Sequence, residues 1–155
     1  MPVKPIPEGY HTATPYLIMN DGAKAIDFYK RAFGATELMR MVAPNGQIAH
    51  AEVKIGDSPV MLADETDDMK SGAQRSPRSL GACSAGLMVY VEDVDARFKQ
   101  ALAAGGRELR PLQDQFYGDR SGTLVDPFGH VWTLASHIED VSPDEIEARA
   151  RKLAG

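Results

Sequence analysis

Hydrophobic and polar positions follow one order of elements that occurs twice along the chain. The first copy opens with an apolar strand expected over 14–19. A helix should follow, because Ile26, Tyr29 and Phe33 recur at spacings of three and four residues. Three further strands, separated by turns rich in Pro, Asn and Gly, are expected over 37–42, 47–55 and 59–63.

The second copy has the same order. A strand is expected over 85–91, and the helix after it carries Val94, Phe98, Ala101 and Leu102 on one face. The spacing from the helix cap Asp21 to the stop Gly34 equals the spacing from Asp93 to Gly106. Strands expected over 108–112, 122–125 and 130–136 complete the copy. The sequence therefore predicts an α+β fold made of two tandem βαβββ modules.

The predicted boundaries leave one domain over 1–155. Module one covers about 12–65 and module two about 83–138. The segment 66–82 is polar, has no apolar period and is expected to be a linker or mobile loop. A capping box that starts at Ser142 predicts a C-terminal helix over 142–154, whose narrow apolar stripe is expected to pack on its own domain.

Composition excludes several classes of protein. A chain of 155 residues is one domain in length, and 43% hydrophobic residues are enough for a core. The formal net charge of -5 argues against binding to nucleic acid. No apolar run is long enough to span a membrane, and no secretory signal is expected. The single Cys83 excludes an intrachain disulfide and favours a reducing, cytoplasmic location.

Two stretches resemble a known family. The first helix reads A-I-D-F-Y-K-R-A-F-G and the last strand is preceded by D-P-F-G-H before V-W-T-L. With the tandem βαβββ modules, these stretches resemble the vicinal oxygen chelate superfamily, which contains glyoxalases, bleomycin-resistance proteins and extradiol dioxygenases. The resemblance covers about 12–138, and F-Y-G-D-R-S-G is similar to its PhnB-like branch. It implies two cupped mixed sheets, a cavity between facing cups and a homodimer.

The resemblance also implies where a metal would be held. Metal-dependent members carry His or Glu on the first and last strands of each module, and the matching positions here are Thr14, Met61, Gly86 and Thr133. Divalent cations prefer carboxylate or imidazole, which none of these four residues supplies. We therefore expect no metal and no cofactor at these positions.

Strand alternation assigns side chains to the cavity face. The expected ligand-binding residues are Tyr16, Ile18, Met61, Met88, Tyr90, Tyr117 and Arg120. Most are apolar or aromatic, as in small-molecule pockets. Arg120 is a candidate clamp for an anion, although an ion pair with a neighbouring Asp is the alternative.

The third strand of module one carries the candidate catalytic pair. Alternation places three small or branched residues beneath a helix: Ala49, Ala51 and Val53. The opposite face then carries Ile48, His50 and Glu52. His50 beside Glu52 suits an oriented general base or two ligands of a displaced metal site, and a purely structural hydrogen-bonded pair is the alternative.

Two further residues with cavity parity are weaker candidates. Glu65 closes the fourth strand of module one and is expected to be solvated. His137 lies at the end of the last strand, where a solvated side chain is again the simpler interpretation.

These observations favour a metal-independent protein that binds or sequesters a small organic molecule in an apolar cavity. The alternative is a metal-dependent lyase, isomerase or dioxygenase with a relocated site around His50 and Glu52, to which Glu65 or His137 is a candidate addition. A structural or interaction module is a third hypothesis. The sequence leaves open whether the protein is an enzyme.

Overall fold

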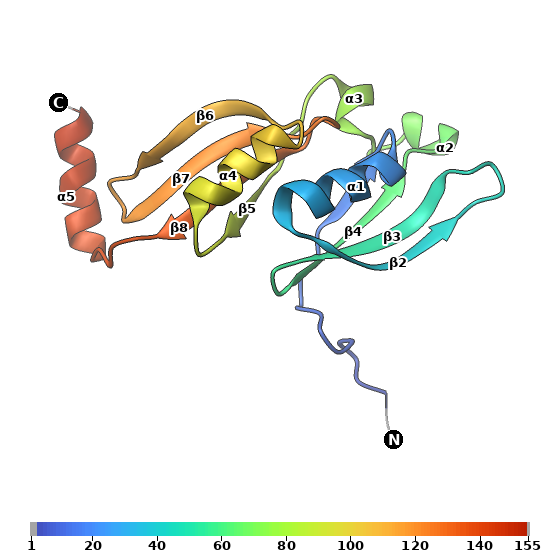
Figure 1. The fold of residues 1–155 in the computed structure, drawn as a ribbon, viewed down its shortest axis with the longest axis horizontal. Coiled ribbons are helices and arrows are strands. Elements are labelled where there is room, and N and C mark those ends of the chain that lie inside the picture. The colour runs from blue at the N-terminus through green and yellow to red at the C-terminus, as the bar shows by residue number, and fades with distance from the viewer. Residues whose placement is uncertain (1–2, 155) are drawn as a thin grey trace.

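The first module of the computed structural model, which describes residues 3–154, is a four-stranded mixed sheet with one helix (Figure 1). Its elements are β1 (Tyr16–Met19), α1 (Gly22–Phe33), β2 (Thr36–Val42), β3 (Ile48–Ile55) and β4 (Ser58–Asp64). The strand order is β1-β4-β3-β2, with β1 parallel to β4 and the other pairs antiparallel.

The second module repeats this arrangement. It consists of β5 (Gly86–Tyr90), α4 (Val94–Ala103), β6 (Arg107–Asp114), β7 (Asp119–Val125) and β8 (Val131–His137). The order β5-β8-β7-β6 has the same parallel first pair. The prediction of an α+β fold with two tandem βαβββ modules is confirmed.

The helix caps explain why the two copies keep their register. The Asp21 side chain accepts a hydrogen bond of 3.1 Å from Lys24 N, and Asp93 accepts one of 2.9 Å from Ala96 N. Gly34 ends α1 in the left-handed conformation, with φ 66°. The second stop differs from the prediction, because α4 ends at Ala103 with a right-handed C-cap at Ala104, and Gly105, at φ 122°, turns the chain.

One continuous core joins the two modules. Helices α1 and α4 pack against each other, and Tyr29, Phe33 and Trp132 form an aromatic cluster at their junction. The ring centroids of Phe33 and Trp132 lie 4.7 Å apart. Burial of each large apolar side chain contributes about 1.5–3 kcal/mol, so this junction holds the modules in a fixed relationship.

The segment between the modules is more ordered than predicted. It contains two short helices, α2 (Asp67–Lys70) and α3 (Pro77–Leu80). Glu65 is only 9% exposed instead of solvated, and its carboxylate accepts hydrogen bonds from Ser76 N at 2.9 Å and from the Ser79 hydroxyl. A buried carboxylate therefore fixes the start of α3 to the end of β4.

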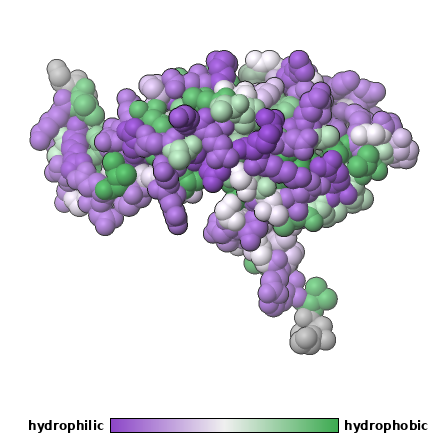
Figure 2. All heavy atoms as spheres, viewed as in Figure 1, coloured by the Kyte–Doolittle hydropathy of each residue, from purple (hydrophilic) through white to green (hydrophobic). Residues whose placement is uncertain are grey.

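The two ends of the described chain lie outside the two sheets. Figures 1 and 2 show the N-terminal arm projecting from the body of the molecule, and α5 (Pro143–Ala154) standing beyond β6 and β7. Arg149 ties α5 to Phe116 O at 3.2 Å and to Glu139 at 2.7 Å. The expectation that the apolar stripe of α5 packs on the domain is wrong at Leu153, which is 72% exposed. None of the helices in the described part of the chain is long and apolar enough to cross a membrane.

The face assignment in β3 needs one correction. Ala51 and Val53 pack beneath α1 as predicted, but Ile48 joins them in the core and Ala49 is exposed. The cause is an irregularity in the ladder between β2 and β3, where Met41 pairs with His50 and the next residue pairs with Ile48. One extra residue in a strand reverses the alternation, which a period of two cannot foresee.

Candidate functional site

Each sheet packs one face on the core and leaves the other face open. On the first sheet, the register pairs Tyr16 with Met61 and Met61 with Glu52. Laterally paired residues share a face, so these side chains lie together opposite the core. We call this surface the first open face; its members are Tyr16, Ile18, Met39, Met41, His50, Glu52, Met61 and Ala63.

A chain of hydrogen bonds runs across the first open face. The Tyr16 hydroxyl lies 2.8 Å from His50 Nδ1, and His50 Nε2 lies 3.0 Å from Glu52 Oε1. The other Glu52 oxygen accepts a hydrogen bond from Tyr10, which anchors the N-terminal arm. His50 and Glu52 therefore lie on one face, and both are mostly shielded from solvent. An imidazole held between a phenol and a carboxylate can orient a ligand or accept a proton.

The second sheet has a matching surface. We call it the second open face; its members are Gly86, Met88, Tyr90, Asp119, Ser121, Thr123, Thr133, Ala135 and His137. Tyr90 is 60% exposed, yet its hydroxyl donates a hydrogen bond of 2.8 Å to the buried Asp119 carboxylate. This hydrogen bond, together with partial burial, raises the pKa of Tyr90.

His137 completes a cluster on the second open face. Its Nδ1 lies 2.8 Å from Asp119 Oδ1, and its Nε2 lies 2.9 Å from Asp140 Oδ1. The hydrogen bonds to Asp119 and Asp140 raise the pKa of His137. Sequence reasoning missed this cluster, because Asp119 and His137 are 18 positions apart and only the pairing of β7 with β8 makes them neighbours.

Two of the residues expected to bind a ligand lie elsewhere or have little free surface. Arg120 points to the helix side of its sheet, where it binds Asp95 Oδ2 at 2.8 Å and Asp114 Oδ1 at 2.9 Å. Ile18 is only 5% exposed. A third, Tyr117, is 36% exposed and packs edge-on against the neighbouring Phe116 ring, with centroids 5.3 Å apart. The structure thus brings Tyr16 and Met61 together on one open face and Met88 and Tyr90 on the other.

The positions that the resemblance matches to metal ligands carry no suitable donor set. Met61 offers a thioether. The Thr133 hydroxyl is hydrogen-bonded to the Thr123 hydroxyl, with 3.0 Å between the two oxygens. Within the described residues, no group of three or more His, Cys, Asp or Glu side chains is arranged to hold a metal ion. The residues at these positions therefore do not fit the divalent ion that the resemblance associates with them.

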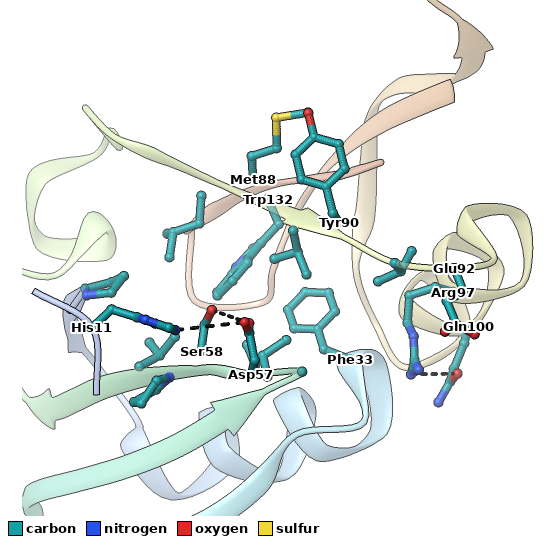
Figure 3. Close-up of a pocket in the computed structure, with 18 of the residues that line it drawn as sticks. His11, Phe33, Asp57, Ser58, Met88, Tyr90, Glu92, Arg97, Gln100 and Trp132 are labelled. Atoms are coloured by element: carbon teal, nitrogen blue, oxygen red, sulfur yellow. Dashed lines mark hydrogen bonds and ion pairs between the residues drawn. The ribbon is translucent and has the colours of Figure 1, made fainter. Parts of the chain in front are cut away.

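A cleft of about 730 Å³ separates the modules beside the edge strand β5 (Figure 3). One wall carries His11, Asp57 and Ser58, and the rings of Phe33 and Trp132 also line the cleft. Met88 and Tyr90 on β5 also line the cleft, and in the same view their side chains point away from Asp57 and Phe33. The volume is within the range of small-molecule pockets.

Comparison with known proteins gives one consistent family. A model described as the Glyoxalase/Bleomycin resistance protein/Dioxygenase superfamily matches residues 10–134. An uncharacterized protein of Mycobacterium bovis is 44% identical over 135 residues, which cover 87% of this chain and 89% of that protein. An uncharacterized protein of Mycobacterium tuberculosis is also 44% identical, over 87% of this chain and 79% of its own length.

Solved structures are also similar to this chain. TioX from Micromonospora sp. ML1 is 30% identical with a TM-score of 0.62, over 81% of this chain and 99% of TioX. A PhnB protein from Bacillus cereus has a TM-score of 0.62 at 22% identity, over 81% of this chain and 99% of its own, and is therefore similar in fold.

Proposed function

We propose that this chain, which belongs to the glyoxalase/bleomycin resistance protein/dioxygenase superfamily, binds a small organic molecule without a metal ion. The supporting observation is the character of the two open faces. Exposed Tyr and Met side chains lie there beside hydrogen-bonded polar groups, while Met61 and Thr133 occupy positions at which a metal would need His or Glu.

Such surfaces suit a partly aromatic ligand. Burial of apolar surface contributes about 25 cal/mol per Å², and aromatic pairs add about 0.5–1.5 kcal/mol. Tyr16, Met88 and Tyr90 are 43%, 47% and 60% exposed, so they retain area to bury. His50 and Glu52 then provide polar anchors that fix the orientation of the ligand.

We further propose that the active form is a homodimer in which the open faces are covered. Met41 and Val42 on β2 are 54% and 56% exposed, and neighbouring apolar residues exposed together usually mark an interface. A cup closed by a second copy would exclude water from the ligand. Light scattering should give twice the chain mass, and Met41→Asp should shift the protein towards the monomer.

The binding proposal is tested with chelator-treated protein and the fluorescent aromatic probe 8-anilinonaphthalene-1-sulfonate. We expect saturable binding of the probe that a chelator does not remove. The Tyr90→Ala substitution should weaken this binding about tenfold, which corresponds to about 1.4 kcal/mol of binding free energy. Leu153→Ala, an exposed apolar change on α5, serves as the matched control. Probe binding that is absent, or equal in the Tyr90 and Leu153 variants, would contradict the proposal.

The hydrogen bonds that connect Tyr16 to His50 and His50 to Glu52 favour a second candidate function. An oriented imidazole of this kind is suited to proton transfer, as a lyase, isomerase or dioxygenase would need. In the metal-dependent form of this candidate, His50 and Glu52 contribute to a relocated metal site. Elemental analysis that finds about one ion per chain, lost in His50→Gln, would favour this candidate over metal-free binding.

We also propose a cytoplasmic location, which the free thiol of Cys83 supports. Fractionation of cells that produce the tagged chain, with a periplasmic marker and a cytosolic marker, tests it. Recovery with the periplasmic marker would contradict the proposal.

A further inference from the structure

His137 lies between two carboxylates that differ sharply in their surroundings. Asp119 is 4% exposed and holds Nδ1 from within the sheet. The Asp140 side chain is fully exposed and holds Nε2 from the segment between β8 and α5. One partner is therefore a fixed part of the fold, and the other is at its surface.

Asp119 fixes the orientation of the imidazole. It also accepts the Tyr90 hydroxyl at 2.8 Å, so its two oxygens are engaged by β5 and β8. With Nδ1 bound to this buried carboxylate, Nε2 points away from the sheet. A ring oriented in this way presents one N–H donor at a defined place on the second open face.

Asp140 has the properties of a replaceable partner. Its only side-chain hydrogen bond in the described chain is with His137, and exposed ion pairs add little net stability. An external carboxylate could take its place without changing the local charge. The neighbouring cation Arg120 cannot serve this purpose, because Asp95 and Asp114 engage it on the other side of the sheet.

We propose that Nε2 of His137 binds the carboxylate group of a small organic acid, in the place that Asp140 occupies in the free chain. Asp119 acts as the positioning residue for His137. Tyr90 presents its exposed ring to the remaining part of the bound organic acid. This inference rests on the proposed binding function and specifies the ligand as a carboxylic acid. The groups that face His137 are Asp119 from β7 and Asp140 from the following segment, with Tyr90 reaching Asp119 from β5.

Protonation favours this role. The hydrogen bonds to Asp119 and Asp140 raise the pKa of His137, so the ring carries a positive charge over a wider range of pH than a free imidazole does. A charged donor makes a stronger hydrogen bond to a carboxylate than a neutral donor does.

The test uses the full chain labelled with ¹⁵N and follows the imidazole signals of His137 during titration with benzoate, with neutral benzamide as the matched probe. The signals are assigned by their loss in His137→Gln. We expect benzoate, and not benzamide, to shift them saturably. Asp140→Asn should bind benzoate about two- to fivefold more tightly, because it removes the competing carboxylate.

The two variants should change the affinity for benzoate in opposite directions, which makes the test decisive. In calorimetric titration, which does not need the imidazole signals, His137→Gln should lose benzoate binding, whereas Asp140→Asn should bind benzoate more tightly; circular dichroism checks that both variants are folded. Benzoate that leaves the His137 signals unchanged in both the parent chain and Asp140→Asn overturns the inference, as does weaker binding in Asp140→Asn. If the naphthalene probe still binds in that case, the carboxylate site fails and the proposed binding function stands.

Discussion

Tyr29 in the first module donates a hydrogen bond of 2.8 Å to the Asp126 carboxylate in the second, 97 positions along the chain. The same oxygen accepts a hydrogen bond of 3.0 Å from Trp132 Nε1. Burial, followed by the nearby Asp126 charge, raises the pKa of Tyr29 well above its ordinary value. A buried carboxylate thus connects α1 to the turn before β8.

Asp126→Asn should destabilise the protein by about 2–4 kcal/mol, because it replaces a charged acceptor in a buried network with an amide. The other Asp126 oxygen accepts hydrogen bonds of 2.9 Å from Phe128 N and His130 N. An amide can accept at one position only, so Trp132 or these two N–H groups lose a partner. Urea unfolding measures the change, and Tyr29→Phe should cost only about 1 kcal/mol. Equal stabilities of the two variants would contradict this account.

The stability that His137 contributes should depend on pH. Its folded pKa is raised from the ordinary value of 6.5, so its contribution is complete below 6.5 and is lost as the pH rises through the folded pKa. The difference in unfolding free energy between the parent chain and His137→Gln should therefore be larger at about pH 5.5 than at about pH 9. Denaturant unfolding at the two pH values checks it. If the difference in unfolding free energy between the two proteins increases with pH, the prediction is wrong.

Gly118→Ala should be strongly destabilising. Gly118 has φ 100°, and a Cβ there would collide with the Glu139 carbonyl oxygen and lie 3.0 Å from Val141 Cγ2. The expected loss is about 2–3 kcal/mol. Gly46→Ala is the matched control, since Gly46 has φ 85° but nothing within 4 Å of the added carbon, and should cost about 1 kcal/mol. Thermal unfolding compares them, and similar losses would show that the collision is relieved.

Glu65→Ala should release the segment between the modules. Burial alone would raise the pKa of Glu65, but hydrogen bonds from Ser79 and Ser76 outweigh it and lower the pKa, so the residue holds α3 as a carboxylate. Trypsin should then cleave faster after Arg75 and Arg78.

Limited proteolysis followed by mass spectrometry measures these cleavages. Asp68→Ala, an exposed change in the same segment, should leave the rate unchanged. Cleavage of the Glu65 variant at the parent rate would show that α3 is held by other contacts.

Local patterns predicted the elements well. The helix over Gly22–Phe33 begins and ends at the residues expected, because Asp21 caps it and Gly34 adopts the left-handed conformation that a side chain disfavours. The pairing of His50 with Glu52 was accessible for the same reason, since the two residues are close in sequence and on one strand.

Local patterns failed where distant residues compete. Ile48 was assigned to the wrong face because the irregular pairing of β2 with β3 is invisible in β3 alone. The sequence predicts a solvated Glu65, because its partners Ser76 and Ser79 lie beyond a polar stretch with no recognisable period. The sequence leaves Arg120 as either an anion clamp or half of an ion pair with a neighbouring Asp, and the structure pairs it with the more distant Asp95 on α4, on the other face of the sheet.

The sequence by itself determined the two modules and their caps, because each depends on residues within one strand, helix or turn. Only the tertiary structure decided that Tyr29 meets Asp126 and that His137 lies between Asp119 and Asp140. Pairing of strands and packing of helices bring together residues far apart in the chain, and burial then sets which charges are held and which remain free to bind.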